Sequence, residues 1–358
     1  MTQLTYEGLI DELLEIRQNA VSIPAHVKLG DGDNRDEAKK IVLNGKEELY
    51  AEIRDANFNA VGPLLSQKAK AINTQFTETK ESSSVKDLKD LVSKLPGIKS
   101  LKESLVRHTA IAEVVKERTN DPAFLDDLRL EQELVNCVSG GDRQLDGLED
   151  VCLERDSVLR VLRLMCLHSL VNGGLRAKVL EHYRSLVLHT FGYGHLTALE
   201  NLEKVGLLGV QQNSRNYAVI RKRLGLTVDN VDEQNPEDVA FVYSVYAPLS
   251  IRLVERLASG WKGIRDVLDL LPGPTVEETR PEARKAMAER ERAGFVRTAV
   301  RTLVVFVGGC TYAEIAALRF LSRREGHGGT FHEYLVATTG MVNGDRLVGS
   351  VTTTKART

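Results

Sequence analysis

The chain has 358 residues, enough for two or three domains with hydrophobic cores of their own. Hydrophobic residues make up 42% and charged residues 27%, as in ordinary globular proteins, and a formal net charge of -2 gives no reason to expect nucleic acid or anionic lipid as the main ligand. Four scattered cysteines favour reduced thiols in the cytosol, and no signal-peptide pattern or apolar run of the roughly 20 residues that span a bilayer is found, so membrane association is expected to be peripheral.

A long helix and its return are predicted in the first third of the chain. Apolar residues recur at multiples of about 3.6 residues, the period of one helix face; they are Leu49, Ile53, Val61, Leu65, Ile72 and Phe76. Gly62-Pro63 predicts a kink or a restart within this helix. Ser84, with Asp87 three residues on, predicts the cap of the next helix. Pro96-Gly97 predicts a turn, after which that helix continues to about Arg118, so the two elements form an αα-hairpin.

Lysine dominates the charge of this predicted hairpin. Residues 66–102 hold eight lysines against four acids. One interpretation is a solvated helix face. The other is a docking surface for an acidic partner helix, since the element is extended, amphipathic and locally basic. The residues alone leave both interpretations open.

A second helical block is expected over residues 122–208. The stretch VCLERDSVLRVLRLMCLHSLV is apolar on nearly every side, which predicts a helix buried among others. HTFGYGHL predicts a short turn with two exposed aromatic side chains. Residues 226–238 carry five acids and no base, which predicts a loop or linker. Residues 272–296, rich in proline and alternating charge, predict a mobile insertion that is partly helical.

Only the C-terminal part predicts a parallel sheet. Residues 303–307 and 334–338 are expected to be strands, with a crossover helix over residues 312–321. Because two strands do not make a stable parallel sheet, the other strands of this sheet are expected to lie outside the chain.

Gly308 and Gly309 join the first of these strands to the helix and invite comparison with a phosphate-binding turn. A P-loop requires GxxxxGK[ST], whereas this turn continues with CTYAE, and the third glycine of a dinucleotide fingerprint is missing. The pattern therefore predicts a structural joint.

The other motifs also argue against catalysis. His327, His332 and Glu333 lie close together but lack the HExxH spacing of zinc sites. His182 and His189 are further apart than the i, i+4 spacing that zinc prefers. No GxSxG motif supports a nucleophile elbow. The sequence therefore predicts a binding protein and not an enzyme, with no cofactor and no metal.

Several stretches resemble the Sec/Munc (SM) family of SNARE chaperones. They are LTYEGLIDE, ELYAEIRDANFNAVGPLLSQKAKAI, VSKLPGIKSLKESLVRHTAIAE, VYAPLSIRLVERL and VVFVGGCTYAEIAALRFLS...YLVATTG. The resemblance covers nearly the whole chain and is closest to the vacuolar and lysosomal members, which belong to the HOPS and CORVET tethering complexes.

This resemblance implies a mixed, mainly α fold. Its parts are the helical third domain of a three-domain arch, with its αα-hairpin, and the closing half of the central α/β parallel-sheet domain. The expected boundaries are 1–120 for the helical domain with the hairpin, 121–225 for a second helical block of the same domain, and 226–358 for the half domain.

The resemblance assigns SNARE binding to the hairpin and implies SNARE proteins as partners, as single helices and as the assembled bundle. The residues expected to contact them are Lys68, Lys70, Ile72, Phe76, Lys80 and Lys86. The lysines would steer the acidic outer face of the bundle, and an exposed Ile72 or Phe76 would supply apolar contact area. The implied function is to hold SNARE helices in register and so lower the entropic cost of nucleating the bundle.

A second implied partner is the large propeller-and-solenoid subunit of HOPS and CORVET. Arg184 and Tyr193 are similar to contact positions of the family, and an arginine and a tyrosine beside a turn suit a binding hot spot. The alternative for Tyr193 is that it only caps the turn between two helices. These partners would place the protein in the cytoplasm, peripherally on vacuolar, lysosomal and endosomal membranes.

Two other function classes remain open. One is a nucleotide-binding α/β protein, which the missing P-loop lysine disfavours. The other is a scaffold that binds only the tether subunit and no SNARE.

Overall fold

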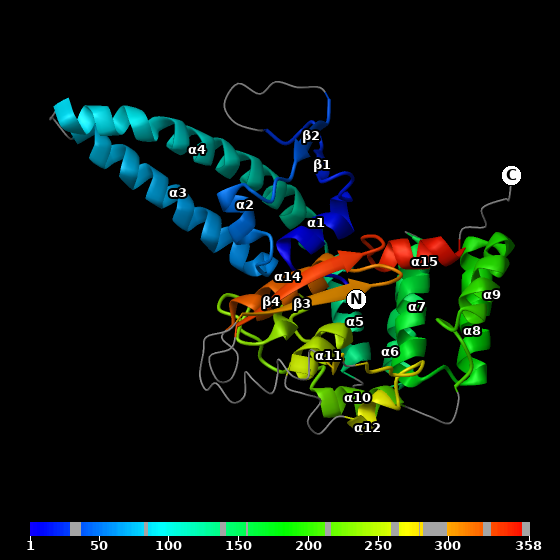
Figure 1. Ribbon diagram of the computed structural model, residues 1–358. Helices are drawn as coiled ribbons and strands as arrows, with labels where there is room; N and C mark the ends of the chain where they lie inside the picture. The colour runs from blue at the N-terminus through cyan, green and yellow to red at the C-terminus, as the bar shows by residue number, and fades with distance from the viewer. Residues whose placement is uncertain are drawn as a thin grey trace, which may run out of the picture.

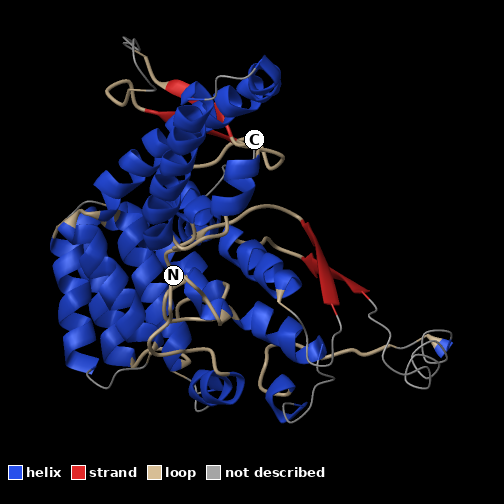
Figure 2. Cartoon of the chain, turned by 90° about the vertical axis from the view of Figure 1, so that its left-hand side faces the viewer, coloured by secondary structure: helices blue, strands red, loops and turns tan. Residues whose placement is uncertain are grey.

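The computed structural model describes residues 1–28, 37–81, 85–136, 141–154, 157–211, 216–258, 265–278, 280–281, 299–324 and 331–352, and of residues 75–81, 85–95, 141–144, 258, 299 and 331 it describes the backbone alone. It shows a helical body from which one long hairpin projects (Figure 1). Two small sheets lie on different sides of this body (Figure 2). The predicted mixed, mainly α fold is confirmed.

The projecting hairpin is built by the N-terminal third of the chain. In order, the elements are α1 (Tyr6–Leu14), β1 (Ala20–Ile23), β2 (Lys39–Val42), α2 (Glu48–Ile53), α3 (Phe58–Glu81) and α4 (Val85–Thr119). Helices α3 and α4 have 24 and 35 residues and form the predicted αα-hairpin. At its base, Val61 and Leu65 of α3 share one buried core with Ile111 of α4 and with α1 and α2. The antiparallel pair β1–β2 was not predicted.

Both prolines of the hairpin lie inside continuous helices. The turn predicted at Pro96-Gly97 is wrong, because α4 runs unbroken through it, and α3 likewise does not restart at Gly62-Pro63. A proline removes one backbone hydrogen bond, but its fixed φ is helical, so the remaining bonds and the packed base hold each helix together. Helix α4 begins at Val85 as predicted, whereas the proposed cap, Ser84, lies outside the described residues.

The second helical block forms the body. Its elements are α5 (Pro122–Val135), α6 (Gly141–Leu153), α7 (Val158–Asn172), α8 (Ala177–Phe191), the short 3-10 helix η1 (Tyr193–His195) and α9 (Leu196–Lys204). Helix α7 is buried among the others, as its all-round apolar sequence predicts, with Leu162 and Met165 in the middle of the core. After it come α10 (Asn216–Leu224), η2 (Val239–Val242), α11 (Leu249–Ala258) and α12 (Arg265–Leu268). Residues 226–238 form a loop, as predicted.

A βαβ unit follows, as the sequence predicts. It consists of β3 (Ala299–Phe306), α14 (Tyr312–Arg323) and β4 (Phe331–Thr338), and α15 (Gly344–Thr352) comes after it. The strands are parallel, with Thr302 opposite Tyr334, and within the described residues they pair only with each other. One face packs against α14 and η2 through side chains such as Val304, whereas the other exposes Leu303 and Val305.

Residues near the two ends of the chain connect the hairpin base, the βαβ unit and the second helical block. Leu4 N donates to Val242 O at 2.9 Å, and Gln3 Oε1 accepts from Ala313 N at 2.8 Å, so the first residues join the βαβ unit to the hairpin base. Helix α15 returns to the body, where Val348 enters the core formed by the second helical block. The domain boundaries at 120 and 225 stay predictions, and most of the predicted insertion, including 282–296, lies outside the described residues.

Candidate functional site

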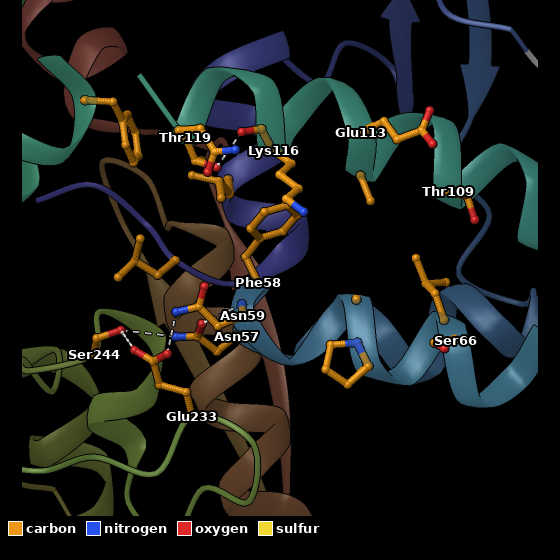
Figure 3. Close-up of a pocket in the computed structure, with 18 of the residues that line it drawn as sticks. Asn57, Phe58, Asn59, Ser66, Thr109, Glu113, Lys116, Thr119, Glu233 and Ser244 are labelled. Carbon is orange, nitrogen blue, oxygen red and sulfur yellow. Dashed lines mark hydrogen bonds between the residues drawn. The ribbon is translucent and has the colours of Figure 1, made fainter. Parts of the chain in front are cut away.

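A pocket of about 740 Å³ lies at the base of the hairpin, between α3, α4 and α5 (Figure 3). Each helix lines it with residues three or four positions apart, the spacing that places side chains on one helix face. These are Phe58, Gly62, Leu65, Ser66 and Ala69 of α3, Leu105, Thr109, Ala112, Glu113 and Lys116 of α4, and Phe124, Leu128 and Gln132 of α5. Three helix faces therefore meet here, and we call this pocket the hairpin-base groove.

The walls of the hairpin-base groove are mainly apolar. Phe58, Leu105 and Phe124 pack with one side against the core of the hairpin base. At the rim, Leu125 keeps 48% of its surface exposed, and Lys116 is exposed on α4. An apolar concavity with a polar rim fits the apolar face of a partner helix.

One end of the groove is polar. Glu233, from the loop before η2, accepts hydrogen bonds from Asn59 Nδ2 at 2.5 Å and from Ser244 Oγ. Asn57 Nδ2 donates to Phe241 O at 2.9 Å and to Ser244 Oγ at 3.2 Å. These bonds fasten the start of α3 to the loop and hold the Glu233 carboxylate at the end of the groove (Figure 3).

Behind the groove, a buried histidine fixes α4 against α1 and α2. His108 is stacked on Tyr50 with ring centroids 5.4 Å apart, and its Nδ1 lies 3.1 Å from Tyr6 Oη. Its Nε2 lies 3.6 Å from the Glu47 carboxylate. Burial lowers the pKa of His108 to about 4 in spite of that carboxylate, so the imidazole is neutral at neutral pH. The α4 wall of the groove is thus held by a buried polar cluster as well as by apolar packing.

Comparison with known proteins shows the family. A sequence model of the Sec1 family matches residues 1–350. The chain belongs to the Sec1 family. Vacuolar protein sorting-associated protein 33A of Rattus norvegicus is 48% identical over 96% of this chain and 58% of its own length, and that of Drosophila melanogaster is 39% identical over 96% and 59%. Vacuolar protein sorting-associated protein 33 of Schizosaccharomyces pombe is 35% identical over 97% and 60%, so the chain spans less than two thirds of these relatives.

Solved structures of SM proteins share the fold. The complex of the SM protein Vps45 with the Qa SNARE Tlg2 matches with a TM-score of 0.64 and 18% identity, over 98% of this chain and 56% of that one. The Unc18–syntaxin 1 complex from Monosiga brevicollis matches with a TM-score of 0.62 and 15% identity, over 98% and 57%. The predicted family resemblance is confirmed, and membership of this family supports the prediction that the chain is not an enzyme.

Of the lysines predicted to contact SNAREs, Lys68 and Lys70 have described side chains, and these side chains lie in different surroundings. Lys70 is exposed and lies one helical turn after Ser66, so it extends the rim of the hairpin-base groove. Lys68 points instead to α2, where its Nζ lies 2.6 Å from the Glu52 carboxylate. Of these two lysines, Lys70 is therefore the one that stands beside the groove, and no ion pair joins it to another described residue.

The prediction that Ile72 offers exposed contact area is wrong. Its side chain keeps 7% of its surface exposed. Ile72 lies seven residues after Leu65, so it continues the inward stripe of α3, which also carries Val61. Phe76, Lys80 and Lys86 lie on α3 and α4, but their side chains are outside the described residues, and their SNARE contacts stay predictions.

The two residues predicted to contact the tether subunit lie at neighbouring sites on α8 and η1. Arg184 is engaged within the chain: its Nε and Nη2 donate to the two carboxylate oxygens of Glu203 on α9, at 2.9 and 2.8 Å. Tyr193 keeps 74% of its surface exposed, and Leu196 beside it is also exposed. Arg184 thus links α8 to α9 within the chain. Of the two residues, Tyr193 is the one whose side chain is exposed and available to a partner.

Gly308 and Gly309 form a tight turn. Both have positive φ, and a Cβ on Gly309 would lie 2.5 Å from Cγ1 of Val342. Gly308 N donates to Thr339 Oγ1 at 2.9 Å. Close packing against Val342, which lies between β4 and α15, requires glycine at position 309, which is what a structural joint needs.

Three backbone amides after this turn, those of Thr311, Ala313 and Glu314, donate to acceptors within the protein. Thr311 caps α14, with its Oγ1 accepting from Glu314 N at 3.1 Å and its N donating to Glu314 Oε2 at 2.9 Å. Ala313 N donates to Gln3 Oε1 at 2.8 Å. These three donors are therefore not free to cradle a phosphate, which favours the joint over the nucleotide site.

The described histidines do not gather into a site. His182 Nε2 lies 2.6 Å from Glu149 Oε1, and His332 stacks on Tyr334, while His327 is outside the described residues. In the described part of the chain, no group of three His, Cys, Asp or Glu side chains is placed to hold a metal ion. None of the helices described there is long and apolar enough to cross a membrane.

The sequence pattern does not predict the groove itself. Its residues belong to ordinary amphipathic stripes, and α5, with Phe124, Leu125 and Leu128 spaced as on one face, carried a readable signal. An apolar stripe in the sequence does not indicate whether another element covers that helix face in the fold. The sequence predicts Glu233 only as part of an acidic loop, because its hydrogen bond to Asn59 joins residues far apart in the chain.

Proposed function

We propose that this Sec1-family chain binds SNARE helices in the hairpin-base groove and serves as a SNARE chaperone in vesicle tethering and fusion. The observation that carries the proposal is the groove, an open apolar surface made by one face each of α3, α4 and α5. Two SM proteins of the same fold were solved with SNAREs, Vps45 with the Qa SNARE Tlg2 and Unc18 with syntaxin 1. An amphipathic SNARE helix has the shape and the apolar stripe that such a groove accepts.

The chemistry of the groove suggests how it would act as a template. A bound helix buries its apolar stripe against Phe58, Leu105 and Phe124. This burial supplies affinity, and the binding stays reversible. Rim lysines such as Lys70 raise the association rate of an acidic helix more than its final affinity. A helix held in this way has already lost the entropy of nucleation, so its partners add to it at lower cost.

Calorimetric titration of the chain with a peptide of a vacuolar Qa SNARE motif and with the assembled four-helix bundle tests this proposal. We expect binding that weakens with salt, and Leu125→Asp should weaken it about tenfold or more, because a charge at the apolar rim opposes burial of the helix. Lys70→Glu should chiefly slow association and reduce the salt dependence.

Two variants provide matched controls. Leu257→Asp changes an equally exposed leucine on α11, and Lys222→Glu changes an exposed lysine on α10. Both should bind like the parent chain. Binding that is indifferent to Leu125→Asp, or no binding by a folded chain, would show that the hairpin-base groove is not the SNARE site.

The vacuolar context and the second partner belong to the same proposal. The relatives are named for vacuolar protein sorting, and we infer that this chain works with the large propeller-and-solenoid subunit of HOPS and CORVET, peripherally on vacuolar, lysosomal and endosomal membranes. The exposed Tyr193 and Leu196 are the surface on which that subunit would dock. A chain that binds this subunit and no SNARE would be the scaffold of the alternative hypothesis.

A further inference from the structure

Among the described residues, Glu233 is the acid on the polar end wall of the hairpin-base groove, and its hydrogen bonds use only part of its capacity to accept. Its Oε2 accepts from Asn59 Nδ2 at 2.5 Å and its Oε1 accepts from Ser244 Oγ. Both donors are neutral, and an ionised carboxylate has about four acceptor positions. Within the described part of the chain, no ion pair joins Glu233 to a lysine, arginine or histidine. The carboxylate is therefore fixed in place, charged and still able to accept further bonds.

The position of the Glu233 carboxylate means that a helix bound in the groove would contact it. Glu233 is half-buried and lines both the hairpin-base groove and a second, more polar pocket of about 680 Å³ beside α14. The two pockets meet at Asn57 and Glu233. A helix that fills the groove and reaches this end covers the carboxylate and removes water from it.

The free-energy cost of removing that water favours some helices over others. A carboxylate that loses water without gaining a cation or donors costs binding free energy, whereas a partner guanidinium or ammonium offsets that cost. The other charged groups on the groove walls are Glu113 and Lys116, which lie on α4 at the opposite wall in Figure 3. Both are exposed at the rim and keep their water more readily than Glu233 does.

We infer that Glu233 is a specificity-determining residue of the groove: it selects a helix that carries an arginine or lysine where its apolar stripe reaches the polar end. This inference rests on the proposed function and names the chemistry of the helix that the groove takes. An arginine fits best, because its planar guanidinium bonds both oxygens of a carboxylate at once. A helix with an apolar or acidic residue at that position leaves the charge unpaired and is rejected.

Calorimetric titration of the full chain and of Glu233→Gln with a vacuolar SNARE-motif peptide tests the inference. The peptide is used as it is and with each of its arginines and lysines replaced by glutamine, one at a time. We expect Glu233→Gln to weaken binding roughly tenfold, the equivalent of about 1.4 kcal/mol. One basic residue of the peptide should be coupled to it: its replacement should weaken binding to the parent chain tenfold and to Glu233→Gln hardly at all.

Glu237→Gln is the matched control. Glu237 lies on the same loop and is exposed, but it does not line the hairpin-base groove, so its loss should leave binding unchanged. Glutamine at position 233 keeps an acceptor for Asn59, and an unchanged melting temperature shows that the loop stays in place. Charge exchange, with Glu233→Arg and the coupled basic residue changed to glutamate, should restore part of the affinity.

The outcomes separate this inference from the proposed function. Binding that Leu125→Asp abolishes but Glu233→Gln leaves unchanged overturns the selective role of Glu233 while the groove remains the SNARE site. The inference also fails if Glu233→Gln weakens binding equally for every peptide, since no basic residue is then its partner. No binding to the parent chain overturns both.

Discussion

At the scale of single residues, buried histidines make the stability of this protein depend on pH. Burial lowers the pKa of His108 and of His168 to about 4 each, from an ordinary value of 6.5. The unfolded chain therefore takes up protons first as the pH falls. The free energy of unfolding therefore has its full value above about pH 6.5. It falls progressively toward pH 4, by up to about 3 kcal/mol for each histidine.

Urea unfolding at a series of pH values measures this loss. We expect His108→Gln to remove part of the decline in unfolding free energy between pH 6.5 and pH 4, since glutamine takes up no proton there. His189→Gln, which changes an exposed histidine on α8, should leave the pH profile as it is. An identical slope in the parent chain and in His108→Gln would mean that this histidine is accessible to protons in the folded state.

At the scale of elements, the glycine turn between β3 and α14 shows how a joint differs from a nucleotide site. Gly309 combines a φ of 132° with close approach to Val342, whereas Gly308 has a φ of 105° and open space beyond it. Gly309→Ala should cost roughly 3 kcal/mol of stability through strain and overlap. Gly308→Ala should cost about 1 kcal/mol, through backbone strain alone.

Thermal unfolding of the two variants, with and without ATP or GTP, checks this assignment. The melting temperature should fall further for Gly309→Ala than for Gly308→Ala, and neither nucleotide should raise it for any of the three chains. A rise for the parent chain that both variants lose would instead make the turn a nucleotide site.

At the scale of the whole molecule, the parallel pair β3–β4 leaves one apolar face uncovered in the described structure. Leu303, Val305 and Leu335 are each exposed by half or more on this face. Open strand edges with apolar side chains are prone to pair with other chains.

Sedimentation velocity at increasing protein concentration tests the consequence. We expect the chain alone to self-associate, and Leu303→Lys with Val305→Lys to keep it monomeric at about the same stability, because both side chains point to solvent. The control is Val219→Lys, at an exposed valine on α10. Self-association that the sheet variants do not reduce would place the contact elsewhere.

The sequence by itself determined most of the elements. The period of the apolar residues predicted α3 and α4, the all-round apolar stretch predicted a buried α7, and the apolar runs around Gly308 and Gly309 predicted the βαβ unit. These signals are local: each depends on residues within one or two turns of one another. Family-specific stretches also sufficed to predict the Sec1 family. Where local rules failed, as at Pro96, packing and the neighbouring hydrogen bonds outweighed one proline.

Only the tertiary structure decided the site. Whether the side chain of Ile72 is available, and whether Lys68 faces a partner or Glu52, depends on which elements pack against α3. The hairpin-base groove exists because three helix faces meet and no other described element covers them. Glu233 reaches the groove from a loop about 170 residues away in the chain. An amphipathic pattern states that a face is apolar. What covers that face is set by contacts between distant segments, which no local pattern contains.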